Sequence, residues 1–236
     1  MKALCIDMGN TKVKWAVFQD GRLLDVQYDT SPAGVDWAQM DQVAVLRTGH
    51  HPEWESILAE LRHLPMVEIS ANMRLPFRNL YKTPQTLGAD RVALVAGASR
   101  MYDGHRLVID AGTCVTYDLL NDKDEYEGGI ISPGLQSRYR AMHEHTAGLP
   151  LLRPSEVEPV IPGRTTAECM HAGATEGWKR EIESFIGYFE QQYPELKVIL
   201  TGGDAPFLYK NIKNKIFAFQ KFLAFEGMYY LLKLNT

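Results

Sequence analysis

Two loops of the sequence combine an aspartate, a glycine and a threonine directly after a run of apolar residues. Segment 7–11 has the sequence Asp-Met-Gly-Asn-Thr, and segment 110–113 has the sequence Asp-Ala-Gly-Thr. A glycine at the end of a strand lets the backbone turn sharply and leaves room for a phosphate group. An aspartate repels phosphate, so its place in the loop is better explained by Mg²⁺ or by a water molecule on Mg²⁺. The pair of loops therefore predicts a site for ATP.

Other features of the sequence agree with nucleotide binding. Asn10 and Thr11 can donate hydrogen bonds to phosphate oxygens, and Lys14 can add a positive charge. A third glycine turn, Thr-Gly-Gly-Asp at 201–204, follows an apolar run, and nucleotides often bind at such strand ends in α/β proteins. No P-loop motif is present, and no Gly-x-Gly-x-x-Gly motif follows a strand. A single Asp-Gly turn is common in unrelated proteins, so the prediction depends on the repetition.

The composition of the 236 residues is that of a globular protein, with 45% hydrophobic and 23% charged residues. A net charge of -4 and the lack of a basic run argue against nucleic acid as a partner. The apolar stretch 3–6 is too short for a signal peptide or a membrane span, so we expect a cytoplasmic protein without a membrane partner. Cys5, Cys114 and Cys169 form no Cys-x-x-Cys pair and are expected to be free thiols.

A pattern of apolar runs separated by polar turns occurs twice along the chain. It predicts strands over 3–6, 13–18 and 23–26, and again over 107–109, 115–120 and 126–131. Further strands are expected over 42–46, 66–69 and 198–200, and helices over 52–64, 89–102, 166–193 and 222–234. The repeat indicates two pseudo-symmetric α/β domains, 1–104 and 105–236, with mixed sheets and a cleft between them. The final helix can pack on either domain.

Five motifs follow one another along the chain: 7–11, Leu-Gly-Ala-Asp-Arg at 87–91, 110–113, Glu-Gly-Gly-Ile-Ile-Ser-Pro-Gly at 127–134, and 201–204. Together they closely resemble the motifs of type III pantothenate kinases, a family of the actin, sugar kinase and Hsp70-like ATPase superfamily. The resemblance implies two ribonuclease H-like domains with mixed five-stranded sheets. It also implies ATP-dependent phosphorylation of pantothenate to 4′-phosphopantothenate, the first step of coenzyme A biosynthesis. Such enzymes resemble one another in being homodimers that need Mg²⁺ and a monovalent cation, K⁺ or NH₄⁺.

The same resemblance implies roles for individual residues. ATP is expected to contact Asp7, Met8, Gly9, Asn10, Thr11, Lys12, Val13, Lys14 and Thr113. Pantothenate is expected to contact Tyr81, Gly88, Ala89, Asp90, Arg91 and Thr166, the last of these from the partner subunit. Asp90 is expected to be the general base, Asp110 to bind the monovalent cation, and Asp7 to hold Mg²⁺ through water.

The pair Asp90 and Arg91 also suits this chemistry on its own. Phosphoryl transfer to a primary alcohol needs a carboxylate that orients and deprotonates the hydroxyl, and Asp90 can fill that role. Arg91 can bind a substrate carboxylate through two parallel hydrogen bonds, and pantothenate has both a primary hydroxyl and a carboxylate. The alternative is an acid in the first turn of a helix beside a surface ion pair.

Two other functions stay open. A sugar or acetamido-sugar kinase of the same superfamily would share the ATP loops but would give Arg91 no carboxylate to bind. A non-catalytic relative would usually have lost the base or a phosphate loop, whereas Asp7, Asp90, Asp110 and Thr113 are all present.

Four positions remain to be explained by the structure. Cys114 stands where the family usually has alanine, and we expect it to be tolerated because a thiol is only slightly larger than a methyl group. Thr165 stands where many relatives carry aspartate. His50 and His51 are adjacent but lack a third ligand at a suitable spacing, so zinc is not expected there.

Overall fold

The computed structural model describes residues 1–10, 12–28, 37–154 and 159–236. The predicted ATP contact Thr11 therefore lies outside the described residues. The chain divides into two compact units. Unit 1 comprises Met1–Tyr102, Asp124–Glu127 and Phe222–Thr236, and unit 2 comprises Asp103–Lys123 and Gly128–Lys221. The final helix thus belongs to unit 1, a choice that the sequence left open.

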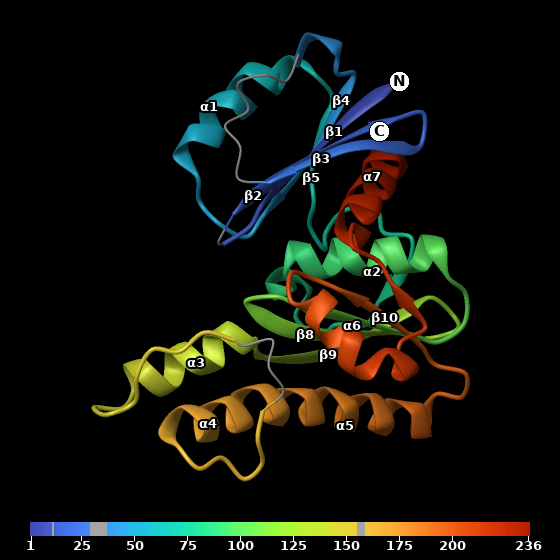
Figure 1. The fold of residues 1–236 in the computed structure, drawn as a ribbon. Helices are drawn as coiled ribbons and strands as arrows, with labels where there is room; N and C mark the ends of the chain where they lie inside the picture. Colours follow the sequence, from blue (N-terminus) through green and yellow to red (C-terminus); the bar gives the residue numbers. More distant parts are fainter. Residues whose placement is uncertain (11, 29–36, 155–158) are drawn as a thin grey trace. The chain divides into compact units, whose positions relative to one another are not determined.

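Unit 1 contains a mixed five-stranded sheet with the strand order β3-β2-β1-β4-β5. Its strands are β1 (Lys2–Met8), β2 (Val13–Gln19), β3 (Arg22–Tyr28), β4 (Gln42–Arg47) and β5 (Met66–Glu68). β1, β2 and β3 pair antiparallel, as two tight turns predict, whereas β4 and β5 run parallel to β1. The mixed five-stranded sheet expected for the first domain is confirmed (Figure 1).

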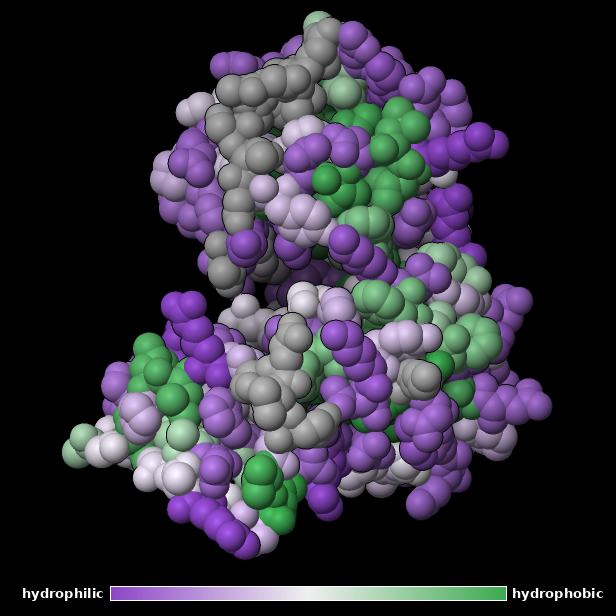
Figure 2. Space-filling model, in the orientation of Figure 1, coloured by the Kyte–Doolittle hydropathy of each residue, from purple (hydrophilic) through white to green (hydrophobic). Residues whose placement is uncertain are grey.

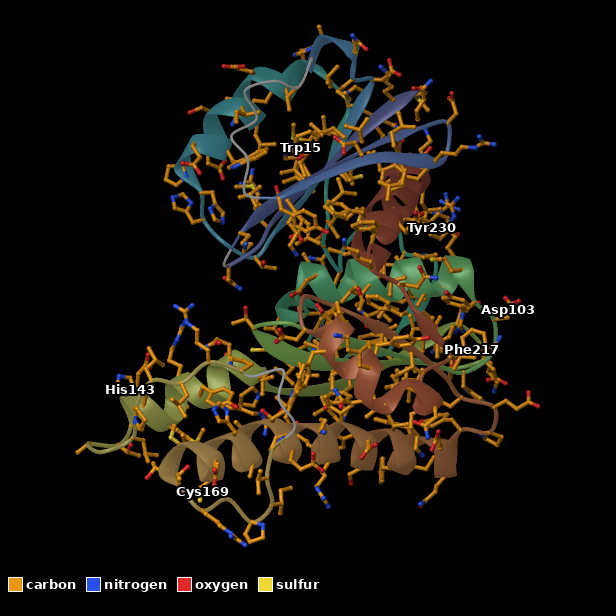
Figure 3. All side chains as sticks on the ribbon, in the orientation of Figure 1. Trp15, Asp103, His143, Cys169, Phe217 and Tyr230 are labelled. Carbon is orange, nitrogen blue, oxygen red and sulfur yellow. The ribbon has the colours of Figure 1, made fainter. Side chains whose placement is uncertain are left out.

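Alternate residues of β1 enter two different apolar layers, because side chains alternate between the faces of a strand. Leu4 and Ile6 belong to one cluster together with Trp54 of helix α1 (Pro52–Glu60). Trp15 belongs to the same cluster and is labelled in Figure 3. On the remaining face of β2, Phe18 stacks on Tyr229 of helix α7 (Leu223–Asn235), with ring centroids 4.5 Å apart.

Helix α2 (Ala89–Met101) is buried along most of its length, as its small and apolar residues predict. It packs directly on α7, and two glycines lie at this contact. A Cβ atom on Gly227 would overlap the backbone carbonyl oxygen of Ala93. The backbones of α2 and α7 therefore approach one another more closely than any larger side chain at position 227 would allow.

The second sheet has the strand order β11-β10-β7-β8-β9-β6. Its strands are β6 (Arg78–Asn79), β7 (Arg106–Ala111), β8 (Cys114–Leu120), β9 (Glu125–Pro133), β10 (Lys197–Thr201) and β11 (Ala218–Phe219). β7 pairs antiparallel with β8 and parallel with β10, so this sheet is also mixed. Five of its strands, β9-β8-β7-β10-β11, repeat the order β3-β2-β1-β4-β5 of the first sheet.

The expected count of five strands is wrong for the second sheet, which has six. The extra strand is β6, which pairs in parallel with Glu125 and Tyr126 at the start of β9. These four paired residues all belong to unit 1. A two-residue strand with the sequence Arg-Asn has no apolar alternation, so the sequence pattern could not predict it.

The helices of unit 2 are α3 (Leu135–Glu144), α4 (Thr166–His171), α5 (Gly177–Gln192) and α6 (Ala205–Ile212). A π-helical turn, Ala172–Glu176, joins α4 to α5, so the long helix predicted over 166–193 is present with one widened turn (Figure 1). Trp178, Ile182 and Ile186 lie on one side of α5 and enter the core beside Leu107 and Ile109 of β7. Their spacing of four residues places them on one helix face.

Short 3₁₀ segments cover Trp37–Gln39, Leu61–His63, Pro84–Thr86 and Lys213–Lys215. In the described part of the chain, no helix combines the length and apolar composition that crossing a membrane would require.

Candidate active site

The first predicted phosphate loop lies where β1 ends and β2 begins. Asp7 and Lys14 are directly opposite one another in this antiparallel pair, and Lys14 Nζ lies 3.5 Å from Asp7 Oδ2. The Gly9 N–H donates to the Lys12 carbonyl oxygen at 3.0 Å and closes the turn. The hairpin therefore brings the carboxylate and the ammonium of the predicted ATP segment together.

A second segment, residues 48–51, lies outside the five motifs and supports this loop. The N–H groups of Thr48 and Gly49 donate to the Met8 carbonyl oxygen at 3.0 and 2.8 Å. His51 Nε2 lies 2.7 Å from the Gly9 carbonyl oxygen and must donate, because a carbonyl only accepts. β1 and β4 pair in parallel, so the segments that follow these two strands lie side by side. A prediction that the two strands pair would therefore have placed residues 48–51 next to the loop.

The adjacent histidines His50 and His51 both belong to the described residues. No group of three or more His, Cys, Asp or Glu side chains suited to a metal ion occurs among them. His51 uses Nε2 for the phosphate loop instead.

The charge of Asp90 acts on the carboxyl of Asp7, although the two residues are far apart in the sequence. Burial raises the pKa of the Asp7 carboxyl, and the charge of Asp90 raises it further, while Lys14 acts in the opposite direction. The structure therefore brings the predicted Mg²⁺ carboxylate and the predicted base into one part of unit 1.

Asp90 lies in the first turn of α2, where the helix dipole favours a negative charge. Its Oδ1 accepts a hydrogen bond from the Arg91 N–H at 2.8 Å. A Cβ atom on Gly88 would collide with that same oxygen. Glycine at position 88 therefore leaves the space that the Asp90 carboxylate occupies.

Tyr81 and Arg91, both predicted to bind the substrate, also lie together. Arg91 is 5% exposed, and its Cζ lies 5.6 Å from the centroid of the Tyr81 ring. This distance is within the range of a cation–π interaction. The backbone of Tyr81 is held by a hydrogen bond of 2.9 Å from its N–H to Asn79 Oδ1.

The second predicted phosphate loop belongs to unit 2, at the end of β7. Asp110 pairs with Thr116 of β8 on one side and with Thr201 of β10 on the other. The Gly112 N–H donates to the Cys114 carbonyl oxygen at 3.0 Å, so Cys114 serves the turn through its backbone. Its side chain is exposed. That a thiol is tolerated at this position stays a prediction.

Two further motifs are anchored on this second loop. The Thr113 carbonyl oxygen accepts the Gly134 N–H at 3.0 Å and the Ser137 hydroxyl at 2.7 Å. The Asp204 N–H donates to the Ala111 carbonyl oxygen at 2.8 Å, and burial raises the pKa of the Asp204 carboxyl. The motifs at 110–113 and 201–204 and residues 128–134 of the motif between them thus meet in unit 2.

Thr166 is the first residue of α4 and is exposed. Thr165 caps this helix: its side chain accepts the Glu168 N–H at 3.2 Å, and Glu168 Oε2 accepts the Thr165 N–H at 3.2 Å. Threonine and aspartate both cap helices well, so threonine can fill the place where the resemblance leads us to expect aspartate. Both threonines line a hollow of about 510 Å³ together with Cys169, which Figure 3 labels.

Comparisons with known proteins decide the family. A family model described as type III pantothenate kinase matches residues 3–187. The type III pantothenate kinase of Flavobacterium johnsoniae is 39% identical over 229 residues, which cover 93% of each chain. The corresponding protein of Bacteroides fragilis is 38% identical over 241 residues, which cover 99% of this chain and 98% of the relative. This chain belongs to the type III pantothenate kinase family. The enzyme class that the motifs predict, a kinase, is therefore confirmed.

Solved structures support the fold. A Campylobacter jejuni protein described as a Baf family transcriptional activator has a TM-score of 0.62 and 22% identity, with 98% of both chains covered. A Sinorhizobium meliloti protein described as a 2-dehydro-3-deoxygalactonokinase has a TM-score of 0.58 and 14% identity, with 99% of this chain and 97% of that chain covered. At these identities the likeness concerns the fold alone, and it confirms the sugar kinase-like fold that the type III pantothenate kinase motifs imply.

Proposed function

We propose that this protein transfers the γ-phosphate of ATP to pantothenate and forms 4′-phosphopantothenate, in the first step of coenzyme A biosynthesis. Membership of the type III pantothenate kinase family supports this function. The observation that carries it is the arrangement at the start of α2, where Asp90 stands beside Arg91 and acts electrostatically on Asp7. A carboxylate for a hydroxyl and a guanidinium for a carboxylate match the two ends of pantothenate.

In this proposal Asp90 accepts the proton of the primary hydroxyl of pantothenate as the hydroxyl oxygen attacks the γ-phosphorus of ATP. The bond between the γ-phosphorus and the oxygen that bridges it to the β-phosphate breaks, and ADP leaves. The dipole of α2 and the Arg91 N–H both stabilise the ionised carboxylate that this step requires. Gly88 and Ala89 bring the backbone close to the substrate, while Tyr81 and Arg91 hold its far end. Positioning and charge stabilisation supply most of the catalysis in phosphoryl transfer, so these contacts matter as much as the base.

The phosphates of ATP would bind at both loops. In unit 1 they would contact segment 7–14, with Lys14 as the positive charge, and in unit 2 they would contact Thr113. Support comes from the turn hydrogen bonds that fix each loop, Gly9 to Lys12 and Gly112 to Cys114.

The oxygen donors of the two loops suit the two expected cations. Mg²⁺ held through water at Asp7 would relieve the repulsion between Asp7 and Asp90, and when bound it neutralises phosphate charge. Asp110, the residue before the last of β7, pairs with Thr201 of β10, and both side chains carry oxygen atoms of the kind that K⁺ or NH₄⁺ would require. Asp110 is therefore the residue proposed for the monovalent cation.

A homodimer is part of the proposal, with Thr166 reaching the substrate of the partner subunit. Thr166 is exposed, as are the apolar side chains of Leu151, Val160 and Ile161 in unit 2. Figure 2 shows apolar surface in the region of α3. Large exposed apolar side chains are typical of protein interfaces. The cytoplasmic location stays a prediction from the sequence.

A substrate panel tests the function. Purified protein is mixed with ATP and Mg²⁺, with and without K⁺, and ADP formation is measured with pantothenate, glucose, N-acetylglucosamine or N-acetylmannosamine as acceptor. Of the four acceptors, we expect only pantothenate to support ADP formation, and only when K⁺ is present. Turnover with a sugar but not with pantothenate would replace the proposal with a sugar kinase, and ATP binding without turnover would favour a non-catalytic relative.

A further inference from the structure

Tyr126 lies in β9, outside all the motifs that define the family, and its side chain is fully buried. Its backbone holds the strand that precedes Tyr81: Tyr126 pairs with Asn79, and its carbonyl oxygen accepts the Leu80 N–H at 3.0 Å. Pairing of the short strand β6 with β9 therefore fixes the position of the backbone just before Tyr81 relative to β9. All these residues belong to unit 1.

The side chain of Tyr126 meets the same two groups that are proposed to bind the substrate. Its ring lies 6.1 Å from the Tyr81 ring, centroid to centroid, with an interplanar angle of 26°. The Arg91 Cζ lies 6.0 Å from the Tyr126 centroid and 5.6 Å from the Tyr81 centroid. The guanidinium and the two rings thus form a nearly equilateral triangle with sides between 5.6 and 6.1 Å.

This triangle suits a guanidinium that must bind a carboxylate. An aromatic face attracts the guanidinium charge, whereas a carboxylate is recognised by N–H groups in the guanidinium plane, so the two contacts do not compete. Rings that restrict the long arginine side chain also reduce the entropy that is lost when a ligand orders it. The edge of the Phe77 ring supports Tyr126 from another side, at 6.0 Å and 62°.

We infer that Tyr126 is a positioning residue for the substrate carboxylate, acting through Arg91 and Tyr81. The inference rests on the proposed function, since it needs a substrate that carries a carboxylate at this end. It adds to that function the reason why Arg91 and Tyr81 act as one unit. The buried ring of Tyr126 contacts both side chains, and the backbone of Tyr126 holds the strand that precedes Tyr81.

The test compares Tyr126→Leu with Tyr126→Phe, which keeps the ring. Steady-state KM values for pantothenate and for ATP, kcat and the melting temperature are measured for each. Tyr126→Leu should raise KM for pantothenate about ten-fold, which corresponds to about 1.4 kcal/mol, and leave KM for ATP within about two-fold. Tyr126→Phe should keep both KM values and kcat close to those of the wild type. Tyr126→Met serves in place of leucine if that variant does not fold.

Two controls separate positioning from a loss of stability. Phe18→Leu removes a fully buried ring elsewhere in unit 1 and should lower the melting temperature without changing KM for pantothenate. The primary amide of pantothenate lacks the negative charge, so Tyr126→Leu should change its KM much less than that of pantothenate. A folded Tyr126→Leu variant with an unchanged KM for pantothenate, or with equal changes for pantothenate and its amide, would overturn the inference. If the wild-type protein does not phosphorylate pantothenate, the proposed function itself is refuted, which is a different outcome from failure of the inference about Tyr126.

Discussion

Replacing Gly88 with alanine should reduce catalysis far more than it reduces stability. The new Cβ atom would meet Asp90 Oδ1 well inside van der Waals contact, whereas its next neighbours, Asp90 Cγ and Arg91 Cγ, would be 3.6 and 3.9 Å away. Only the end of one flexible side chain has to move. The backbone angles of Gly88, φ -58° and ψ 136°, are open to alanine, so the backbone can stay where it is.

The expected magnitudes follow from that geometry. Rotation of Asp90 would break its hydrogen bond to the Arg91 N–H, which costs about 1 kcal/mol of stability. Alanine would offset roughly 0.4–1 kcal/mol of this by reducing the freedom of the unfolded chain. A displacement of about 1 Å at a catalytic group can cost about 100-fold in rate. We therefore expect kcat to fall about 100-fold while the free energy of unfolding changes by about 1 kcal/mol or less.

The assay measures kcat for pantothenate phosphorylation and urea unfolding for the wild type, Gly88→Ala and Gly187→Ala. Gly187 lies in α5 with nothing within 4 Å of its Cβ position, so alanine there should leave kcat unchanged and stabilise the helix by about 0.5–1 kcal/mol. A Gly88→Ala variant with wild-type kcat would refute the placement of the Asp90 carboxylate. A variant that loses rate and fold together would show that the backbone, rather than the side chain, had moved.

Two further predictions concern stability. Gly227→Ala should force α2 and α7 apart at the Ala93 carbonyl oxygen. The free energy of unfolding should fall by about 1–3 kcal/mol and the melting temperature by roughly 3–10 °C. An unchanged melting temperature would contradict the close approach of the two helices. Glu176→Gln should cost about 1 kcal/mol at pH 7, because the hydrogen bond and charge of Lys179 lower the pKa of the Glu176 carboxyl. Since the folded pKa lies below the unfolded value of 4.5, this stabilisation is complete above that value and disappears as the pH falls through the folded pKa. Urea unfolding at pH 7, 5 and 4 should therefore show the difference narrowing toward acid, and a difference that stays constant with pH would argue against the ion pair.

The repeated strands could be predicted because their signal is local. In β1 and β2 apolar residues run up to a polar turn, and the same pattern recurs in β7 and β8. Strand β6 could not be predicted in this way. It is two residues long, polar in sequence, and held by pairing with a strand more than forty residues further along the chain.

The candidate site likewise has features that the sequence could predict and features that it could not. The hairpin spacing could have predicted that Asp7 faces Lys14, since both lie at the turn of β1 and β2. The electrostatic coupling of Asp7 to Asp90 depends on how α2 packs in unit 1, and no spacing in the sequence encodes it. The support of Gly9 by His51 was also missed, because the histidine was considered only as a metal ligand.

The most direct test of the account is the rate of pantothenate phosphorylation by Asp90→Asn, followed by ADP release and by formation of 4′-phosphopantothenate. Asparagine keeps the size of the side chain and removes its basicity. We predict that kcat falls about 10²–10⁴-fold while KM for ATP stays near the wild-type value, as expected for loss of a general base. Asp103→Asn, an exposed position labelled in Figure 3, should leave kcat unchanged. Full activity of Asp90→Asn would contradict the role of Asp90 as the base.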